Sequence, residues 1–188
     1  MLKQYQDLLA DVRGDGQYHS VRSLVQPDDP DVQEVADVLI QGNDFISAAQ
    51  DFVSAFTIYK SEIGDYWSTP DEVLLNRSGD CDCLAILLCS ILRNFIPAED
   101  VYCAVGNLDP GKKNSGHMWV VTVDKNGKER IVEATAPSTR PITGVYAVEG
   151  LFNDKYAFAT DFGLKDFDLL PVLLGTPVPF EEMATIVS

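Results

Sequence analysis

The chain has 188 residues and carries 29 acidic residues against 14 Lys and Arg, for a formal net charge of −15. This charge repels nucleic-acid phosphates and anionic lipids, so we expect neither nucleic acid nor a membrane as a partner. With 46% hydrophobic and 23% charged residues, the composition is that of a globular protein and excludes a disordered chain. The length suits a single domain over residues 1–188.

The compartment can be predicted from two features. The chain has no apolar run long enough to span a membrane, and its first residues lack the basic and apolar regions of a signal peptide, so we expect a cytoplasmic protein. The cysteines are clustered, which is not how a secreted disulfide framework is distributed, and we expect free thiols. They are Cys81, Cys83, Cys89 and Cys103.

Apolar residues that recur every three or four positions predict a helical N-terminal part over residues 1–64. Such stripes run over residues 2–12, 30–40 and 45–59. Because these segments carry no catalytic pattern, we expect them to form scaffold.

Residues 65–136 hold the candidate catalytic core. Thr69 can cap a short helix, with Pro70 in its first turn and Glu72 closing a capping box. Residues 80–92 then form a helix whose apolar stripe is too wide for a surface position, so it is expected at the buried centre of the fold.

The hydrophobic period changes to two after Pro97. Strands are predicted over residues 101–105, 117–123 and 131–135. Helices followed by strands indicate an α+β domain with an antiparallel sheet. In residues 137–188 we expect a further hairpin and then extended segments that wrap the surface, because prolines disfavour a helix there.

Cys81 begins the most hydrophobic helix, directly after Gly79-Asp80. A helix N-terminus favours a thiolate and can hold an oxyanion, so Cys81 is a candidate nucleophile with a pKa below the usual value of about 8.5. The alternative is a small buried hydrophobic residue, which is the commonest fate of a free cysteine. His117 opens a strand at the rim of the sheet, where it could act as the base.

Glu133 lies in an apolar strand and is a candidate partner for His117. A two-residue turn at Asn126-Gly127 would place the two side chains on opposite faces of the hairpin. A three-residue loop, Lys125 to Gly127 with a left-handed glycine, would place them on the same face, within reach of each other. We predict the three-residue loop, and we expect that face to pack on the helix led by Cys81.

Several blocks, in this order and spacing, resemble the transglutaminase-like cysteine peptidase superfamily, most closely its bacterial branch. The blocks are Asp65–Glu72, Gly79–Ala85, Gly116–Val120 and Val132–Thr135. The resemblance implies a papain-like core in which Cys81 is the nucleophile, His117 the general base and Glu133 the acid that orients the imidazole. The family more often has Asp at this last position. No cofactor is implied.

The family's chemistry implies a cysteine peptidase or amidase that acts on an amide or isopeptide bond through a thioester. Transfer of the acyl group to a lysine amine, which is crosslinking, is one alternative, and a catalytically silent binding module is another. Trp67 and Trp119 flank the site in sequence and are candidates for substrate contact or for packing. The acidic charge favours a neutral or basic peptide substrate.

Two other readings concern the thiols. Cys81, Cys83, Cys89 and His117 could be zinc ligands, but residues two apart on a helix point to different sides and fit such a site poorly. We therefore predict no metal site. A redox pairing of Cys81 with Cys103 is the other alternative.

Overall fold

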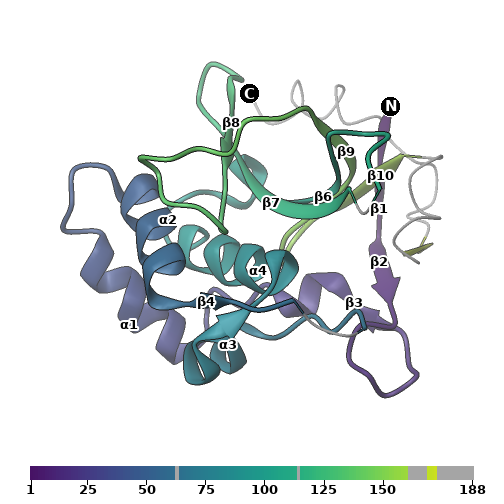
Figure 1. Cartoon of the computed structure of the whole chain (residues 1–188), viewed down its shortest axis with the longest axis horizontal. Coiled ribbons are helices and arrows are strands. Elements are labelled where there is room, and N and C mark those ends of the chain that lie inside the picture. The colour runs from purple at the N-terminus through teal and green to yellow at the C-terminus, as the bar shows by residue number, and fades with distance from the viewer. Residues whose placement is uncertain (62–63, 114, 161–168, 173–188) are drawn as a thin grey trace.

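The computed structural model describes residues 1–61, 64–113, 115–160 and 169–172. Its helices gather on one side of a curved antiparallel sheet (Figure 1). The α-helices are α1 (Pro30–Leu39), α2 (Phe45–Phe56), α3 (Pro70–Asn76) and α4 (Cys81–Leu92), with 3₁₀ turns at Val21–Leu24 and Ala98–Asp100. The predicted α+β class is therefore confirmed.

The main sheet has six strands in the order β1-β10-β9-β6-β7-β8, and all its pairings are antiparallel. Its strands are β1 (Leu2–Tyr5), β6 (Val101–Leu108), β7 (Gly116–Val123), β8 (Glu129–Val132), β9 (Tyr146–Phe152) and β10 (Ala157–Thr160). A second sheet joins β2 (Asp7–Ala10), β3 (His19–Ser20) and β11 (Leu170–Val172), and β4 (Ile58–Tyr59) pairs in parallel with β5 (Ser78–Gly79). The predicted hairpin near the end of the chain is β9–β10, whereas residues 173–188 lie outside the described part.

The helix starts agree with the capping residues in the sequence. The Asp29 carboxylate accepts hydrogen bonds from two backbone N–H groups in the first turn of α1. At α3, Thr69 and Glu72 form the predicted capping box. Glu72 also accepts two hydrogen bonds of 2.8 Å from Arg13, whose guanidinium donates to the Trp67 carbonyl as well. Residues 65–72, which lead to the site, are thus tied to the N-terminal segment.

Helix α4 is the centre of the core, as its composition predicts. Every residue from Asp82 to Leu92 is buried, and the helix contacts α1, α2 and α3 as well as β6 and β7. On the sheet, Met118 and Val120 of β7 and Val132 of β8 belong to the same core cluster.

The first predicted helix is wrong. Residues 2–10 form β1 and β2 instead, because β1 pairs with β10 and β2 with β11 and β3. Leu8, Ala10 and Val12 are buried at a period of two, which also fits the apolar pattern. The prediction that α2 extends to Tyr59 is wrong as well: the helix ends at Phe56, and Tyr59 pairs with Gly79 in the β4–β5 ladder.

The hairpin register agrees with the three-residue loop. Val120 pairs with Val132 and Val121 with Ile131, and Gly127 has a φ of 74°. His117 and Glu133 meet on one side of the hairpin, as predicted, although Glu133 lies just after the end of β8 and not in a strand over residues 131–135. That face does not pack on α4, however, because Met118 and Val120 are opposite Val105 and Cys103 of β6, and these pairs occupy the α4 side. Trp119 and Val121 belong to a second core cluster on the other face.

Gly79 allows the close approach of β5 to the first turn of α4. A Cβ atom there would lie 2.6 Å from the Cβ of Cys83, which is backbone-fixed and cannot move away. We expect Gly79→Ala to lower the free energy of unfolding by about 1–3 kcal/mol in denaturant titration, as overpacking does. Gly42→Ala is the matched control, since its nearest contact would be an ordinary 3.5 Å, and a change within about 0.5 kcal/mol is expected. Equal effects of the two variants would contradict this account.

Candidate active site

Cys81 is the first residue of α4 and lines a pocket of about 300 Å³. The β4–β5 pairing brings Tyr59 beside the start of the helix, and His117 is the second residue of strand β7. The residues around the pocket are Tyr59, Asp65, Trp67, Asp80, Cys81, Asp82, Val105, Gly116, His117 and Met118. The three sequence blocks that contain Trp67, Cys81 and His117 are thus brought together.

The Cys81 thiol is not activated in the way that the sequence predicts. Burial raises its pKa to about 12, and the neighbouring Asp82 carboxylate adds to this shift. The backbone N–H of Met118 donates to the sulfur and acts in the opposite direction. The expectation of a lowered pKa is therefore wrong, because burial of the thiol, to which the charges of Asp82 and Asp80 add, outweighs the effect of the helix N-terminus. At neutral pH this thiol is protonated.

Asp80, which is half-buried, and Asp82, which is buried, form an acidic pair beside the thiol. Burial raises the pKa of Asp82 well above its usual range, and the hydrogen bond and charge of Asp80 add to the effect. One carboxylate oxygen of each residue is buried without a hydrogen-bond partner among the described residues. Together with Cys83 they form a group whose possible ligand atoms lie within 4.8 Å of one another, so this is where the described chain could hold a cation.

His117 and Glu133 are joined by a hydrogen bond of 2.9 Å between Nε2 and Oε2. The Glu133 side chain is 3% exposed. Burial acts to raise its pKa, but the hydrogen bond and charge of His117, with the Thr135 hydroxyl, outweigh burial and lower the pKa below its usual value. Glu133 is therefore an ionised carboxylate at neutral pH.

Two residues that the sequence analysis did not identify complete the surroundings of Glu133. The Tyr146 hydroxyl donates to Oε2 at 3.0 Å, on the oxygen that faces His117. The Thr135 hydroxyl donates to Oε1 at 2.9 Å, and its backbone N–H donates to the same atom at 3.3 Å. Thr135 could have been found from its place two residues after Glu133. Tyr146 could not, since it arrives on β9 through the register of β9 with β6.

The thiol and the imidazole share the pocket without being bonded to each other. Among the described residues, no hydrogen bond joins Cys81 to His117. Because Glu133 occupies Nε2, the Nδ1 atom is the one left for the thiol proton. Hydrogen bonds between catalytic groups often tighten only when substrate binds, so a longer separation in the free protein is compatible with proton transfer.

The two tryptophans have different positions. Trp67 lines the pocket, although it is 1% exposed, and its ring stacks on Phe152 with centroids 6.0 Å apart. Trp119 is fully buried and is not among the residues that line the pocket. Its ring lies 6.0 Å from that of His117 and 4.9 Å from that of Tyr146, so Trp119 packs behind the imidazole.

The other three cysteines do not line the Cys81 pocket. Cys83 accepts a hydrogen bond from the Ser68 N–H and donates to the Tyr66 carbonyl. Cys89 and Cys103 are fully buried and contact each other in the core. The neighbour of Cys103 is therefore Cys89, and not Cys81 as the redox alternative requires. The hypothetical zinc set is likewise not assembled: of its members, only Cys81 and His117 line the pocket.

Comparison with known proteins identifies the family of the chain. Residues 65–160, just over half of the chain, match the model of the CEP76 peptidase-like domain. Comparison with curated proteins found no match.

Similar solved structures include LapG of Legionella pneumophila, with a TM-score of 0.45 and 20% identity over 69% of this chain and 82% of that one. Calcium-bound LapG of the same organism has a TM-score of 0.44 and 18% identity, over 77% and 96%. The family match over residues 65–160, which contain the sequence blocks and the pocket residues Cys81 and His117, leads to one conclusion: the chain belongs to the CEP76 peptidase-like domain family.

Proposed function

We propose that the protein is a cysteine peptidase or amidase in which Cys81, His117 and Glu133 act together on an amide or isopeptide bond. The observation that carries the proposal is the 2.9 Å hydrogen bond between His117 and a buried, ionised Glu133, at the border of the pocket that contains Cys81. A buried carboxylate without a function costs free energy, and this one is fully hydrogen-bonded in the orientation that a catalytic imidazole requires.

The proposed reaction begins with a neutral thiol, because the pKa of Cys81 is raised to about 12. His117 takes the thiol proton as the sulfur attacks the substrate carbonyl, and the Met118 N–H stabilises the negative charge on sulfur as it develops. The resulting oxyanion can accept a hydrogen bond from the backbone N–H of Cys81, at the positive end of α4. His117 then protonates the leaving amine, which leaves a thioester that water hydrolyses.

The role proposed for Glu133 follows from its hydrogen bonds. It fixes the ring of His117 through Nε2 and stabilises the imidazolium that forms during attack. Thr135 and Tyr146 hold the carboxylate in place by donating to its two oxygens. A glutamate in place of the more usual aspartate thus reaches the imidazole with both oxygens satisfied.

The charges around the pocket support a neutral or basic substrate. Asp65, Asp80 and Asp82 line it, and among the described residues no Lys or Arg does. A substrate carboxylate beside the scissile bond would be repelled, whereas a lysine side chain would be attracted. The same attraction would favour a lysine amine as the acceptor of the acyl group, so crosslinking is the second candidate reaction.

The test is a panel of peptidyl coumarin amides with Lys, Gln, Ala or Glu before the scissile bond, combined with iodoacetamide labelling and mass mapping. We expect release of the amine from the Lys, Gln and Ala members, none from the Glu member, and none in Cys81→Ala. Addition of a lysine analogue would divert the product to the transferred amide if crosslinking is the activity. If no member is cleaved and alkylation of Cys81 is the same in wild type and His117→Ala, the protein is a binding module.

The raised pKa of Cys81 makes a prediction for alkylation by iodoacetamide. Because the thiolate is the reactive form, the rate should rise about tenfold per pH unit from pH 7 to pH 10, without a plateau. The rate constant of Cys81 modification is read by mass spectrometry at each pH, with free cysteine, which has a pKa of about 8.5, as the control that levels off. A plateau for Cys81 below pH 8 would instead indicate a preformed thiolate.

A further inference from the structure

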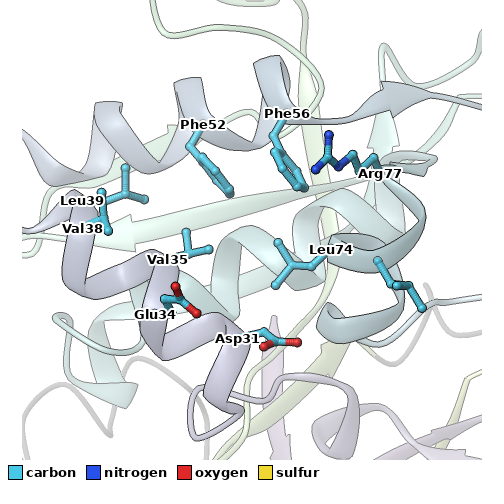
Figure 2. Close-up of a pocket in the computed structure, with 10 residues that line it drawn as sticks. Asp31, Glu34, Val35, Val38, Leu39, Phe52, Phe56, Leu74 and Arg77 are labelled. Carbon is cyan, nitrogen blue, oxygen red and sulfur yellow. The ribbon is translucent and has the colours of Figure 1, made fainter.

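A second cavity lies between the helices and shares no lining residue with the Cys81 pocket. It is an open groove of about 540 Å³ bounded by α1, α2 and α3. Figure 2 shows Phe52 and Phe56 extending from α2 toward Val35 and Leu74, which line the opposite side. The two phenylalanine rings stack with centroids 5.0 Å apart, so this wall is a flat aromatic surface.

The rim of the groove exposes large apolar side chains that the fold does not use. Leu75 is 83% exposed and Val38 is 66% exposed. Both lie on helices whose other faces already pack on the core through Val73 and Val32. Single exposed apolar residues are ordinary, but here they border a concave aromatic surface, which is the usual form of a protein-binding groove.

The charges at the groove are separated. Asp31 and Glu34 line its α1 border, and neither forms an ion pair with any residue in the described part of the chain. Arg77 lies at the opposite end, with its guanidinium 4.9 Å from the centre of the Phe56 ring and no carboxylate partner among the described residues. Figure 2 shows the two acids along one border and Arg77 beside Phe56. An occupant would therefore meet negative charge along α1 and one positive charge at the α2–α3 end.

We propose that this groove binds an amphipathic helix of a protein partner, with an apolar stripe and Lys or Arg along one flank. A groove between helices suits the helix-in-groove mode, in which residues at i, i+4 and i+7 fill the apolar surface. The ten residues of α1 are about 15 Å long, which matches about three turns of a bound helix. The basic flank pairs with Asp31 and Glu34, and an acidic residue near one end pairs with Arg77.

The same charges argue against the two occupants that the chain itself could supply. A second copy would bring another net charge of −15 to an acidic border. The C-terminal residues 173–188 contain two glutamates and neither Lys nor Arg, so they lack the basic flank. A separate, basic partner is the occupant that the groove complements. This inference does not depend on the proposed catalysis.

The test is selection of helical peptides from a phage-displayed library against the 188-residue protein, followed by fluorescence anisotropy with the selected peptides. We expect them to share an apolar i, i+4, i+7 stripe with Lys or Arg on one flank. Leu75→Asp and Val38→Asp should each weaken binding at least tenfold. Val145→Asp, which alters an apolar residue that is 65% exposed outside the groove, is the matched control and should leave affinity unchanged.

Charge reversal distinguishes this groove from a surface that binds apolar peptides non-specifically. In the double variant Asp31→Lys, Glu34→Lys, the same library should yield peptides with an acidic flank. The proposal is overturned if selection yields no helical binders, if the binders keep their affinity for Leu75→Asp, or if charge reversal leaves the selected flank basic. A dimer of the purified protein that Leu75→Asp dissociates would assign the groove to a second copy and overturn it as well.

Discussion

His117→Ala is expected to lower kcat/KM about 10²- to 10⁴-fold, the range in which a positioned general base contributes. The effect belongs at the upper end because the thiol has a pKa of about 12 and little thiolate exists at pH 7 for the substrate to meet. An enzyme with a preformed ion pair would lose its thiolate in this variant, whereas this protein loses the group that removes the proton during attack. The measurement is the steady-state hydrolysis of the best coumarin amide.

The other histidine supplies the matched control. His19 lies on β3, where its ring contacts the Asp15 carboxylate at 2.8 Å on the exposed surface. His19→Ala should leave kcat/KM within about twofold of wild type, since His19 does not line the pocket. High pH should partly restore the kcat/KM of the His117→Ala variant, because hydroxide then generates the thiolate. A loss in His117→Ala of less than tenfold at pH 7 would contradict its role as the base.

The sequence predicts most reliably those elements whose causes are local. The start of α3 follows from Thr69, Pro70 and Glu72, which lie within four residues of one another and satisfy the same helix end. The β7–β8 register follows from a single loop, in which Gly127 adopts the left-handed conformation. Helix α4 follows from composition alone, since only a buried helix tolerates so wide an apolar surface.

Elements that depend on distant partners were predicted wrongly or not at all. Residues 2–10 carry an apolar spacing that suits a helix, but pairing with β10 and β11 turns them into strands. The face of β7 that meets α4 is decided by β6, which places Val105 opposite Met118. The residues near Met118 do not indicate which face of β7 meets α4, because this depends on which of two hydrophobic faces the rest of the fold covers.

In the candidate site, too, the features with a local cause could be predicted and those that depend on burial could not. The side-by-side placement of His117 and Glu133 could be derived from one hairpin. The pKa of Cys81 could not, because the helix N-terminus is visible in the sequence whereas the burial of the thiol and of Asp82 is not. The charge of a carboxylate one residue away changes the thiol pKa little when water screens it and strongly in a buried pocket. Only the structure distinguishes the two cases.

Glu133→Gln is expected to lower kcat about 10²- to 10⁴-fold while the protein stays folded. The amide has the size of the carboxylate, but its NH₂ group must face donors at either Thr135 or the His117–Tyr146 side, so at least one hydrogen bond is lost. Loss of the negative charge also removes the stabilisation of the protonated imidazole. The acid limb of the kcat/KM profile should therefore move to lower pH, which steady-state rates between pH 4 and pH 9 would show.

Tyr146→Phe provides the opposite perturbation of the same carboxylate. Without the Tyr146 hydroxyl, Oε2 keeps only His117 as its donor, and its charge acts more strongly on the imidazole. We expect a loss in kcat of less than about tenfold, the scale of one typical net hydrogen bond, because the bond between Glu133 and His117 remains, and a shift of the acid limb to higher pH. A purely structural role for Tyr146 would lower the rate without moving the limb. If both variants shift the limb in the same direction, Glu133 does not act on His117 through its charge, and the proposed mechanism fails at that step.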